Sequence, residues 1–169
     1  MSDAPDQHLL DALLDSWDRN NTILVNLLRV LPEGGLDTRA MEGSPSVAEM
    51  FTHMHYVRLV FVSEDASEFA TRLPERKWAA ERDPARIAQM LKESAQVVRD
   101  AVKSRMQTGR DMDLHYDSPV LFLQHMIWHE GYHHGQIKLA LKLAGHAISN
   151  DRAGPGTWRV WMNKTSKSS

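Results

Sequence analysis

The stretch HEGYHHGQ, residues 129–136, combines residue types that can bind a metal ion. His129 and His133 are four positions apart, and side chains at this spacing lie one turn apart on the same side of a helix. Imidazole nitrogens are common ligands of zinc, copper, iron and nickel. The first five residues also match H-E-x-x-H, the zinc-protease pattern in which the glutamate, here Glu130, is the general base.

A helical wheel indicates which of these side chains face inward. With about 100° per residue and His129 as the origin, a group of residues falls within about 60° of it: Phe122, Met126, His133, Ala140, Leu143 and Ala144. On this wheel His125 lies on the core side and Glu130 lies off the centre of the inward face. An inward imidazole needs a polar partner, because its burial otherwise costs free energy. One metal ion would satisfy both histidines; hydrogen bonds to core neighbours are the alternative.

A metal site of the catalytic type needs a third protein ligand. The segment SVAEMFTHMH, residues 46–55, offers His53 and His55. They lie on opposite flanks of its apolar stripe, so the wheel does not choose between them.

The protease interpretation fails on the surrounding residues. The metzincin extension of H-E-x-x-H needs Gly and His at positions occupied by Gln136 and Leu139, and no glutamate follows Glu130. Zincins also hold peptides by strand addition, which an all-helical chain cannot offer.

Four long helical segments must position these residues. The apolar spacing predicts helices over 6–31, 46–72, 84–107 and 119–144. Ser46 with Glu49 forms a capping-box pattern, and Asp83 and Ser118 each precede a proline at the first helical position. The segment GTWRVWM, 156–162, is expected to pack on the helices or on a second subunit. The expected class is all-α, a four-helix bundle.

Composition excludes several function classes. The chain has 169 residues, which suits a single domain, 1–169, with the polar end 163–169 expected to be disordered. A net charge of −2 gives no electrostatic case for nucleic acid or a membrane surface as partner. The absence of cysteine excludes disulfides and thiolate ligands. The sequence shows no signal peptide or membrane span, so we expect a cytoplasmic protein.

Two motifs resemble the DinB-like (DinB/YfiT) superfamily of bacterial helical proteins. SVAEMFTH, 46–53, is similar to that family's S-[VI]-x-E-[LM]-x-x-H entry into its second helix. HEGYHHGQI, 129–137, is similar to its H-x-x-x-H-R-G-Q-[IL] motif, with His134 in place of the arginine. The resemblance covers nearly the whole chain.

The resemblance implies a metal site made by His53, His129 and His133, which holds one divalent ion, nickel or zinc. It also implies an up-down-down-up helix order and a homodimer. Gln136 and Tyr132 are expected either to support a ligand or to contact substrate.

The family also implies a class of chemistry. Some of its branches are transferases or isomerases that use a low-molecular-weight thiol, so we expect a small-molecule substrate and a metal-dependent thiol transferase. A metal-dependent hydrolase and a non-catalytic, metal-stabilised binding module are the alternatives. His125, Glu49 and Glu130 are the candidate proton-transfer residues.

Overall fold

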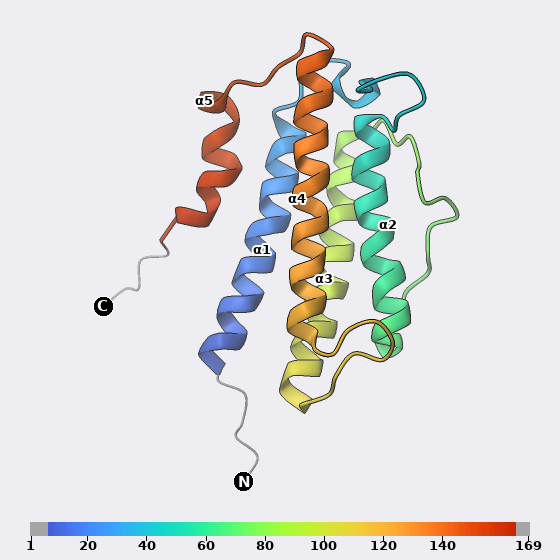
Figure 1. Cartoon of the computed structure of the whole chain (residues 1–169), viewed down its shortest axis with the longest axis vertical. Coiled ribbons are helices and arrows are strands. Elements are labelled where there is room, and N and C mark those ends of the chain that lie inside the picture. The colour runs from blue at the N-terminus through green and yellow to red at the C-terminus, as the bar shows by residue number, and fades with distance from the viewer. Residues whose placement is uncertain (1–6, 165–169) are drawn as a thin grey trace.

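The computed structural model describes residues 7–164, and this part of the chain is helical, without a β-strand. Four long helices lie side by side (Figure 1). They are α1 (Gln7–Arg29), α2 (Val47–Asp65), α3 (Pro84–Thr108) and α4 (Pro119–Leu143). The predicted all-α class is confirmed. Helices α2 and α1 each pack against both α3 and α4.

The helices begin where their capping residues predict. The Ser46 hydroxyl accepts the Glu49 backbone N–H, and the Glu49 carboxylate accepts the Ser46 N–H, which completes the capping box at the start of α2. Asp83 and Ser118 cap α3 and α4, each followed by a proline. Gly109, in the left-handed region with φ 64°, ends α3.

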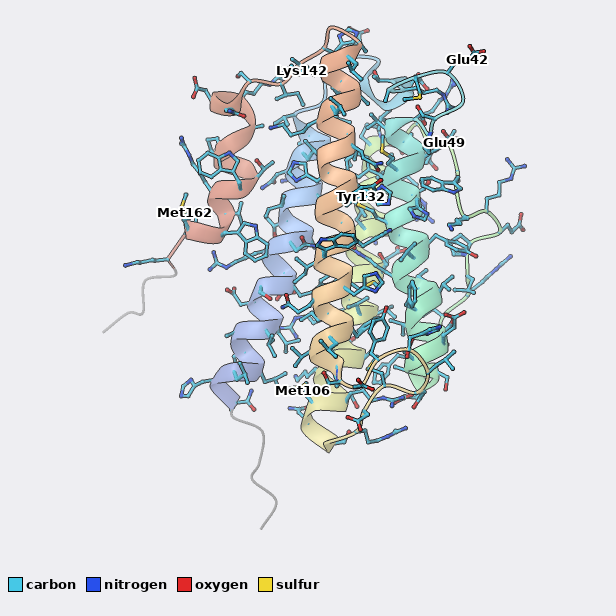
Figure 2. All side chains as sticks on the ribbon, viewed as in Figure 1. Glu42, Glu49, Met106, Tyr132, Lys142 and Met162 are labelled. Carbon is cyan, nitrogen blue, oxygen red and sulfur yellow. The ribbon has the colours of Figure 1, made fainter. Side chains whose placement is uncertain are left out.

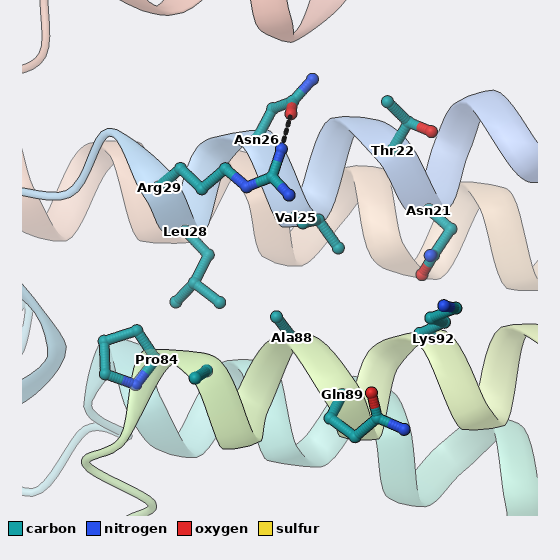
Figure 3. Close-up of a pocket in the computed structure, with 11 residues that line it drawn as sticks. Asn21, Thr22, Val25, Asn26, Leu28, Arg29, Pro84, Ala88, Gln89 and Lys92 are labelled. Atoms are coloured by element: carbon teal, nitrogen blue, oxygen red, sulfur yellow. Dashed lines mark hydrogen bonds between the residues drawn. The ribbon is translucent and has the colours of Figure 1, made fainter.

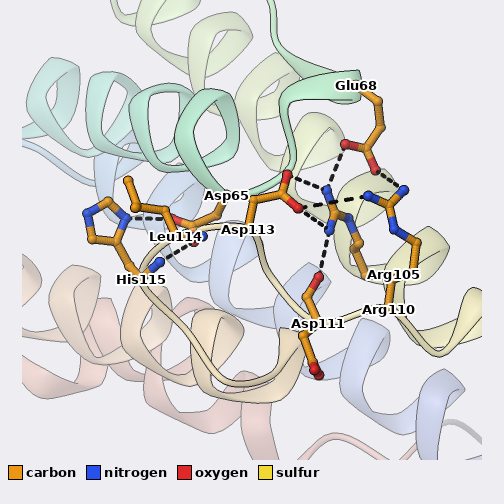
Figure 4. Close-up of polar contacts among 8 residues, drawn as sticks. All are labelled: Asp65, Glu68, Arg105, Arg110, Asp111, Asp113, Leu114 and His115. Atoms are coloured by element: carbon orange, nitrogen blue, oxygen red, sulfur yellow. Dashed lines mark hydrogen bonds and ion pairs between the residues drawn. The ribbon is translucent and has the colours of Figure 1, made fainter.

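Helix α2 ends earlier than predicted, at Asp65 rather than near Arg72. The fully buried Asp65 carboxylate accepts the backbone N–H groups of Leu114, at 3.0 Å, and His115, at 2.6 Å. It also accepts the His115 ring Nδ1–H at 2.8 Å (Figure 4). The loop that contains Leu114 and His115 therefore docks on the last turn of α2, and the chain leaves the helix at Ala66. Apolar periodicity could not reveal this contact.

A second ionic cluster, centred on Arg105 of α3, fixes the chain that follows α2. The buried Arg105 donates to Asp113, at 2.8 and 2.7 Å, to Glu68, at 2.8 Å, and to the Asp111 carbonyl (Figure 4). It therefore ties the short 3₁₀ turn Ser67–Phe69 to the loop that leads into α4.

Within the described part of the chain, the core has two apolar clusters with a buried polar layer between them. One cluster is centred on Trp17 and Phe122, and the other on Phe51 and Leu91. Each long helix places a buried polar residue near the boundary between the two clusters. These residues are Asn20 of α1, Arg58 of α2, Ser94 of α3 and Glu130 of α4.

Two segments outside the long helices lie against them. The connection between α2 and α3 is fixed at Ala79, whose carbonyl and N–H both bond to the Thr52 hydroxyl, at 2.7 and 3.1 Å. The C-terminal segment holds α5 (Asn150–Ala153) and the 3₁₀ turns Gly154–Gly156 and Trp158–Met162. It packs on α1, where Asn26 donates to the Gly156 carbonyl.

Of the predicted tail 163–169, residues 165–169 lie outside the described part, and the single domain 1–169 stays a prediction. Among the described helices, none combines the length and the apolar character that crossing a membrane requires.

Replacing Asp65 by alanine is expected to lower the free energy of unfolding by about 2–3 kcal/mol, because it removes the buried carboxylate that accepts two backbone N–H groups and the His115 ring N–H. Urea denaturation would measure the loss. His115→Ala, which removes only a partly exposed ring, is the matched control and should cost less than about 1 kcal/mol. Equal costs for the two variants would contradict the role given to the Asp65 carboxylate.

Candidate metal centre

Three histidines from two helices meet between α2 and α4. His53 comes from α2, and His129 and His133 come from α4. Each ring offers one ligand atom, and these three atoms lie within 4.8 Å of one another. Nε2 of His129 and Nε2 of His133 are 3.1 Å apart, and the His53 ring meets both rings edge-on at centroid distances of 5.3 and 5.0 Å. The three residues predicted as ligands thus form a cluster that could hold a metal ion.

The geometry of the α4 pair fits a metal. Two ligands that each lie about 2.0–2.1 Å from a tetrahedral zinc ion are roughly 3.3 Å apart, which is close to the observed separation of the two Nε2 atoms. The Gln136 side-chain oxygen accepts the Nδ1–H of His133 at 2.8 Å. Because Nδ1 then carries the proton, the lone pair of His133 is on Nε2, the atom that faces His129. Gln136, predicted as a support or a substrate contact, thus orients His133.

The protonation states also suit a metal. Burial lowers the pKa of His53 to about 3 and that of His129 to about 4, and it lowers the pKa of His133 below its usual value. Each imidazole is therefore neutral at pH 7, the form that binds metal ions.

His53, rather than His55, belongs to the cluster. The His55 ring turns toward α3, where its Nδ1–H donates to the Met90 carbonyl at 2.7 Å. The ambiguity that the helical wheel left between the two histidines is removed by the packing of α2 on both neighbouring helices.

Trp78 covers one side of the cluster, and sequence reasoning missed it. It lies on the connection that Thr52 fixes to α2, and its ring stacks on the His53 ring with a centroid distance of 3.8 Å and an interplanar angle of 11°. A tryptophan in a connection rich in charged residues was the available signal.

Glu130 lies in the core, so its predicted position off the centre of the inward face was wrong. Its side chain is 1% exposed. Its two oxygens accept a pair of hydrogen bonds from Arg58, at 2.5 and 2.8 Å, and one from Asn20 at 2.5 Å. The wheel was centred on His129, whereas the buried face of α4 runs along Met126, Glu130 and Ile137, which turns Glu130 inward.

Arg58 is the second residue that sequence reasoning missed. It is fully buried, it donates to the Leu91 carbonyl at 2.7 Å, and its guanidinium lies over the Trp17 ring at 4.7 Å. An arginine inside the apolar run of α2 was the signal for a buried ion pair.

The other predicted residues surround the cluster at different distances. Glu49 serves the α2 cap and pairs with Arg39 at 2.9 Å, contacts that keep its pKa low. The His125 ring lies 6.5 Å from the His129 ring, and its Nδ1 is 2.7 Å from the Tyr116 hydroxyl.

Two further residues of α4 flank the cluster. Tyr132 lies on α4 with its side chain 54% exposed (Figure 2). Its ring meets the His133 ring at a centroid distance of 5.3 Å. His134, which stands where the family motif has arginine, is half-buried, and its Nε2 has no partner among the described residues.

Fold and site together define an all-helical protein with a buried three-histidine cluster suited to a divalent metal. The sequence model of the DinB family matches residues 1–154, so the chain belongs to the DinB family.

A crystal structure of a proposed DinB-family member from Exiguobacterium sibiricum 255-15 has a similar fold. The TM-score is 0.58, and the two sequences are 21% identical over 90% of this chain and 99% of that one. No curated protein sequence matches the chain.

Removing the carboxylate of Glu130 is expected to destabilise the fold, because it leaves the buried Arg58 charge unpaired. Glu130→Ala should lower the free energy of unfolding by about 3–5 kcal/mol in urea denaturation. The control is Asp37→Ala, which removes the partner of the exposed Arg82 and should change the free energy of unfolding by less than about 0.5 kcal/mol. A Glu130→Ala variant as stable as Asp37→Ala would contradict a structural role for the buried pair.

Proposed function

We propose that this protein is a metal-dependent transferase that uses a low-molecular-weight thiol. The observation that supports it is a cluster of three neutral imidazoles without a fourth protein ligand: within residues 7–164, no further His, Asp or Glu joins the group. Structural zinc sites close with four protein ligands, whereas catalytic sites have three and leave a position for water or substrate.

The charge of the site favours nucleophile activation. Because all three ligands are neutral, the site leaves the full charge of a divalent ion in place. A bound ion lowers the pKa of a coordinated water or thiol and so supplies a nucleophile at neutral pH. The chain has no cysteine, so the thiol must come from a small molecule. Imidazole ligands suit both nickel and zinc.

Residues around the cluster complete the proposal. The Trp78 ring shields His53 from water on one side, and Gln136 fixes the orientation of His133. His125 is the best placed proton-transfer group, since it neighbours His129 and is bonded to Tyr116. Burial raises the pKa of Tyr116 to about 12, so its hydroxyl stays protonated. Glu130 is committed to Arg58 and Asn20, and Glu49 to the Ser46 N–H and Arg39, which leaves His125 as the favoured candidate among the three.

Two other functions fit the same cluster. A metal-dependent hydrolase would use water in place of the thiol, and a non-catalytic binding module would use the ion only to join α2 to α4. The missing fourth ligand favours the catalytic functions over the structural one.

The helix order forms part of this proposal. We propose the up-down-down-up bundle, which places α2 and α4 side by side so that both can supply ligands. The supporting features are the contact between α2 and α4 and the long connection from Asp65 to Pro84.

We also propose that the protein forms a homodimer through the outer side of α4. Large apolar side chains there are more than half exposed and recur at steps of seven and four residues: Leu121, Trp128, Tyr132, Leu139 and Leu143. Gly131 and Gly135 lie among them, and a Cβ added at either would meet no atom within 4 Å, so a second helix could approach closely. This spacing is typical of a helix seam that packs on another helix.

Metal content and thiol chemistry test the function together. Purified protein should contain about one divalent ion per chain, and His53→Ala, His129→Ala and His133→Ala should each lose most of it because three ligands are needed. His146→Ala, an exposed histidine of the same protein, should keep the metal. Full occupancy in all three ligand variants would contradict the site.

The same protein is then offered a small thiol and a haloalkane, and thioether formation is followed by mass spectrometry. The metal-loaded protein should accelerate the reaction, and the His129→Ala variant should not. Hydrolysis of an ester without thioether formation would favour the hydrolase, and loss of stability on chelation without either reaction would favour the binding module.

The dimer is tested by light scattering during size-exclusion chromatography. Trp128→Glu should give a monomer, because it places a charge in the apolar seam. Trp161→Glu makes the same change at an exposed tryptophan of the C-terminal segment and should leave the dimer intact. A monomeric unmodified protein would overturn this part of the proposal.

A further inference from the structure

A groove of about 640 Å³ lies between α1 and α3 and shares none of its lining residues with the histidine cluster. Figure 3 shows the two helices on either side of it. Apolar side chains line one part: Val25 and Leu28 from α1 face Pro84 and Ala88 from α3. Asn21 and Lys92 face each other across the other part.

The buried Arg58 sets the orientation of the Asn21 side chain. Arg58 donates from Nη1 to the Asn21 oxygen at 3.0 Å. A guanidinium can only donate hydrogen bonds, so the Asn21 oxygen is the atom that bonds Arg58, and its NH₂ group is left available to the groove that Asn21 lines. Among the described residues, no acceptor bonds to this NH₂ group. A fixed hydrogen-bond donor is therefore presented to whatever lies in the groove.

The charges at the groove are positive. Lys92 forms no ion pair with a carboxylate of the described chain, and neither does Arg29, which donates only to Asn26 at 3.4 Å. The Glu93 carboxylate, the next residue along α3, accepts a hydrogen bond from Gln89 at 2.9 Å. The polar end therefore offers one ammonium group and one amide donor, a combination that suits an oxyanion.

We propose that this groove binds an aliphatic carboxylate of medium length. The carboxylate lies between Lys92 and the Asn21 NH₂ group, and the alkyl chain extends over Val25, Ala88 and Leu28. Asn21 and Leu28 are seven residues apart on one helix, which corresponds to about 10 Å along its axis. Apolar burial of the chain supplies affinity, and the donors at one end fix its direction.

Octanoate is the probe, and heteronuclear NMR of the full chain is the measurement. Titration should shift the Asn21 side-chain amide signal and the backbone signals of Val25 and Ala88. 1-Octanol has the same chain without the charge and should bind at least about tenfold more weakly, since it cannot use the Lys92 charge. Equal binding of octanol and octanoate, or no binding of octanoate, would overturn the proposal.

Variants locate the site. Asn21→Asp keeps an acceptor for Arg58 but replaces the donor with a carboxylate oxygen, and should weaken octanoate binding about tenfold or more. Lys92→Glu should do the same, whereas Lys103→Glu, an equal change of charge farther along α3, should leave the dissociation constant within twofold. Ala88→Trp fills the apolar part and should abolish binding. Unchanged affinity in Asn21→Asp and Ala88→Trp would place the ligand elsewhere and overturn the assignment.

Discussion

The buried ion pair between Arg58 and Glu130 is the contact on which the arrangement of the four helices depends. Both side chains are almost completely buried, and the two parallel hydrogen bonds between them join α2 to α4. Two charges in the interior cost several kcal/mol each unless every polar atom finds a partner. Here Asn20 from α1 and Ser94 from α3 complete the set, so all four long helices contribute to one polar layer.

This layer constrains the register of the helices more strongly than apolar packing does. An apolar contact survives a small sliding of one helix, because apolar packing is nearly non-directional. A guanidinium that bonds two carboxylate oxygens, a carbonyl and an amide oxygen has little such freedom. His129 and His133 flank Glu130 on the same helix, and His53 is five residues before Arg58. The pair that fixes α2 against α4 therefore also sets the distance across the histidine cluster.

The sequence predicted the helices well where their signals are local. Capping residues such as Ser46 and Ser118 act on the backbone next to them, and the starts of α2 and α4 followed from them. The end of α2 did not follow, because the Asp65 carboxylate acts on a loop fifty residues away.

The same distinction separates the parts of the site. The spacing of His129 and His133 was enough to predict them as a ligand pair. The choice of His53 over His55 depends on how α2 packs between two other helices. Trp78 reaches the cluster from the irregular stretch 70–83, so no periodicity could place it.

The H-E-x-x-H stretch of α4 contributes residues to two separate sites. Consecutive residues on a helix point about 100° apart, so the Glu130 carboxylate does not point at the histidine cluster. In a zinc protease the glutamate must reach the reacting water. Here its oxygens are saturated by Arg58 and Asn20, and its side chain is sealed from solvent. The two histidines meet His53 of α2, whereas the glutamate meets Arg58 five residues further along the same helix. The residues that match the protease pattern therefore divide into a candidate metal centre and the buried ion pair that holds it in place.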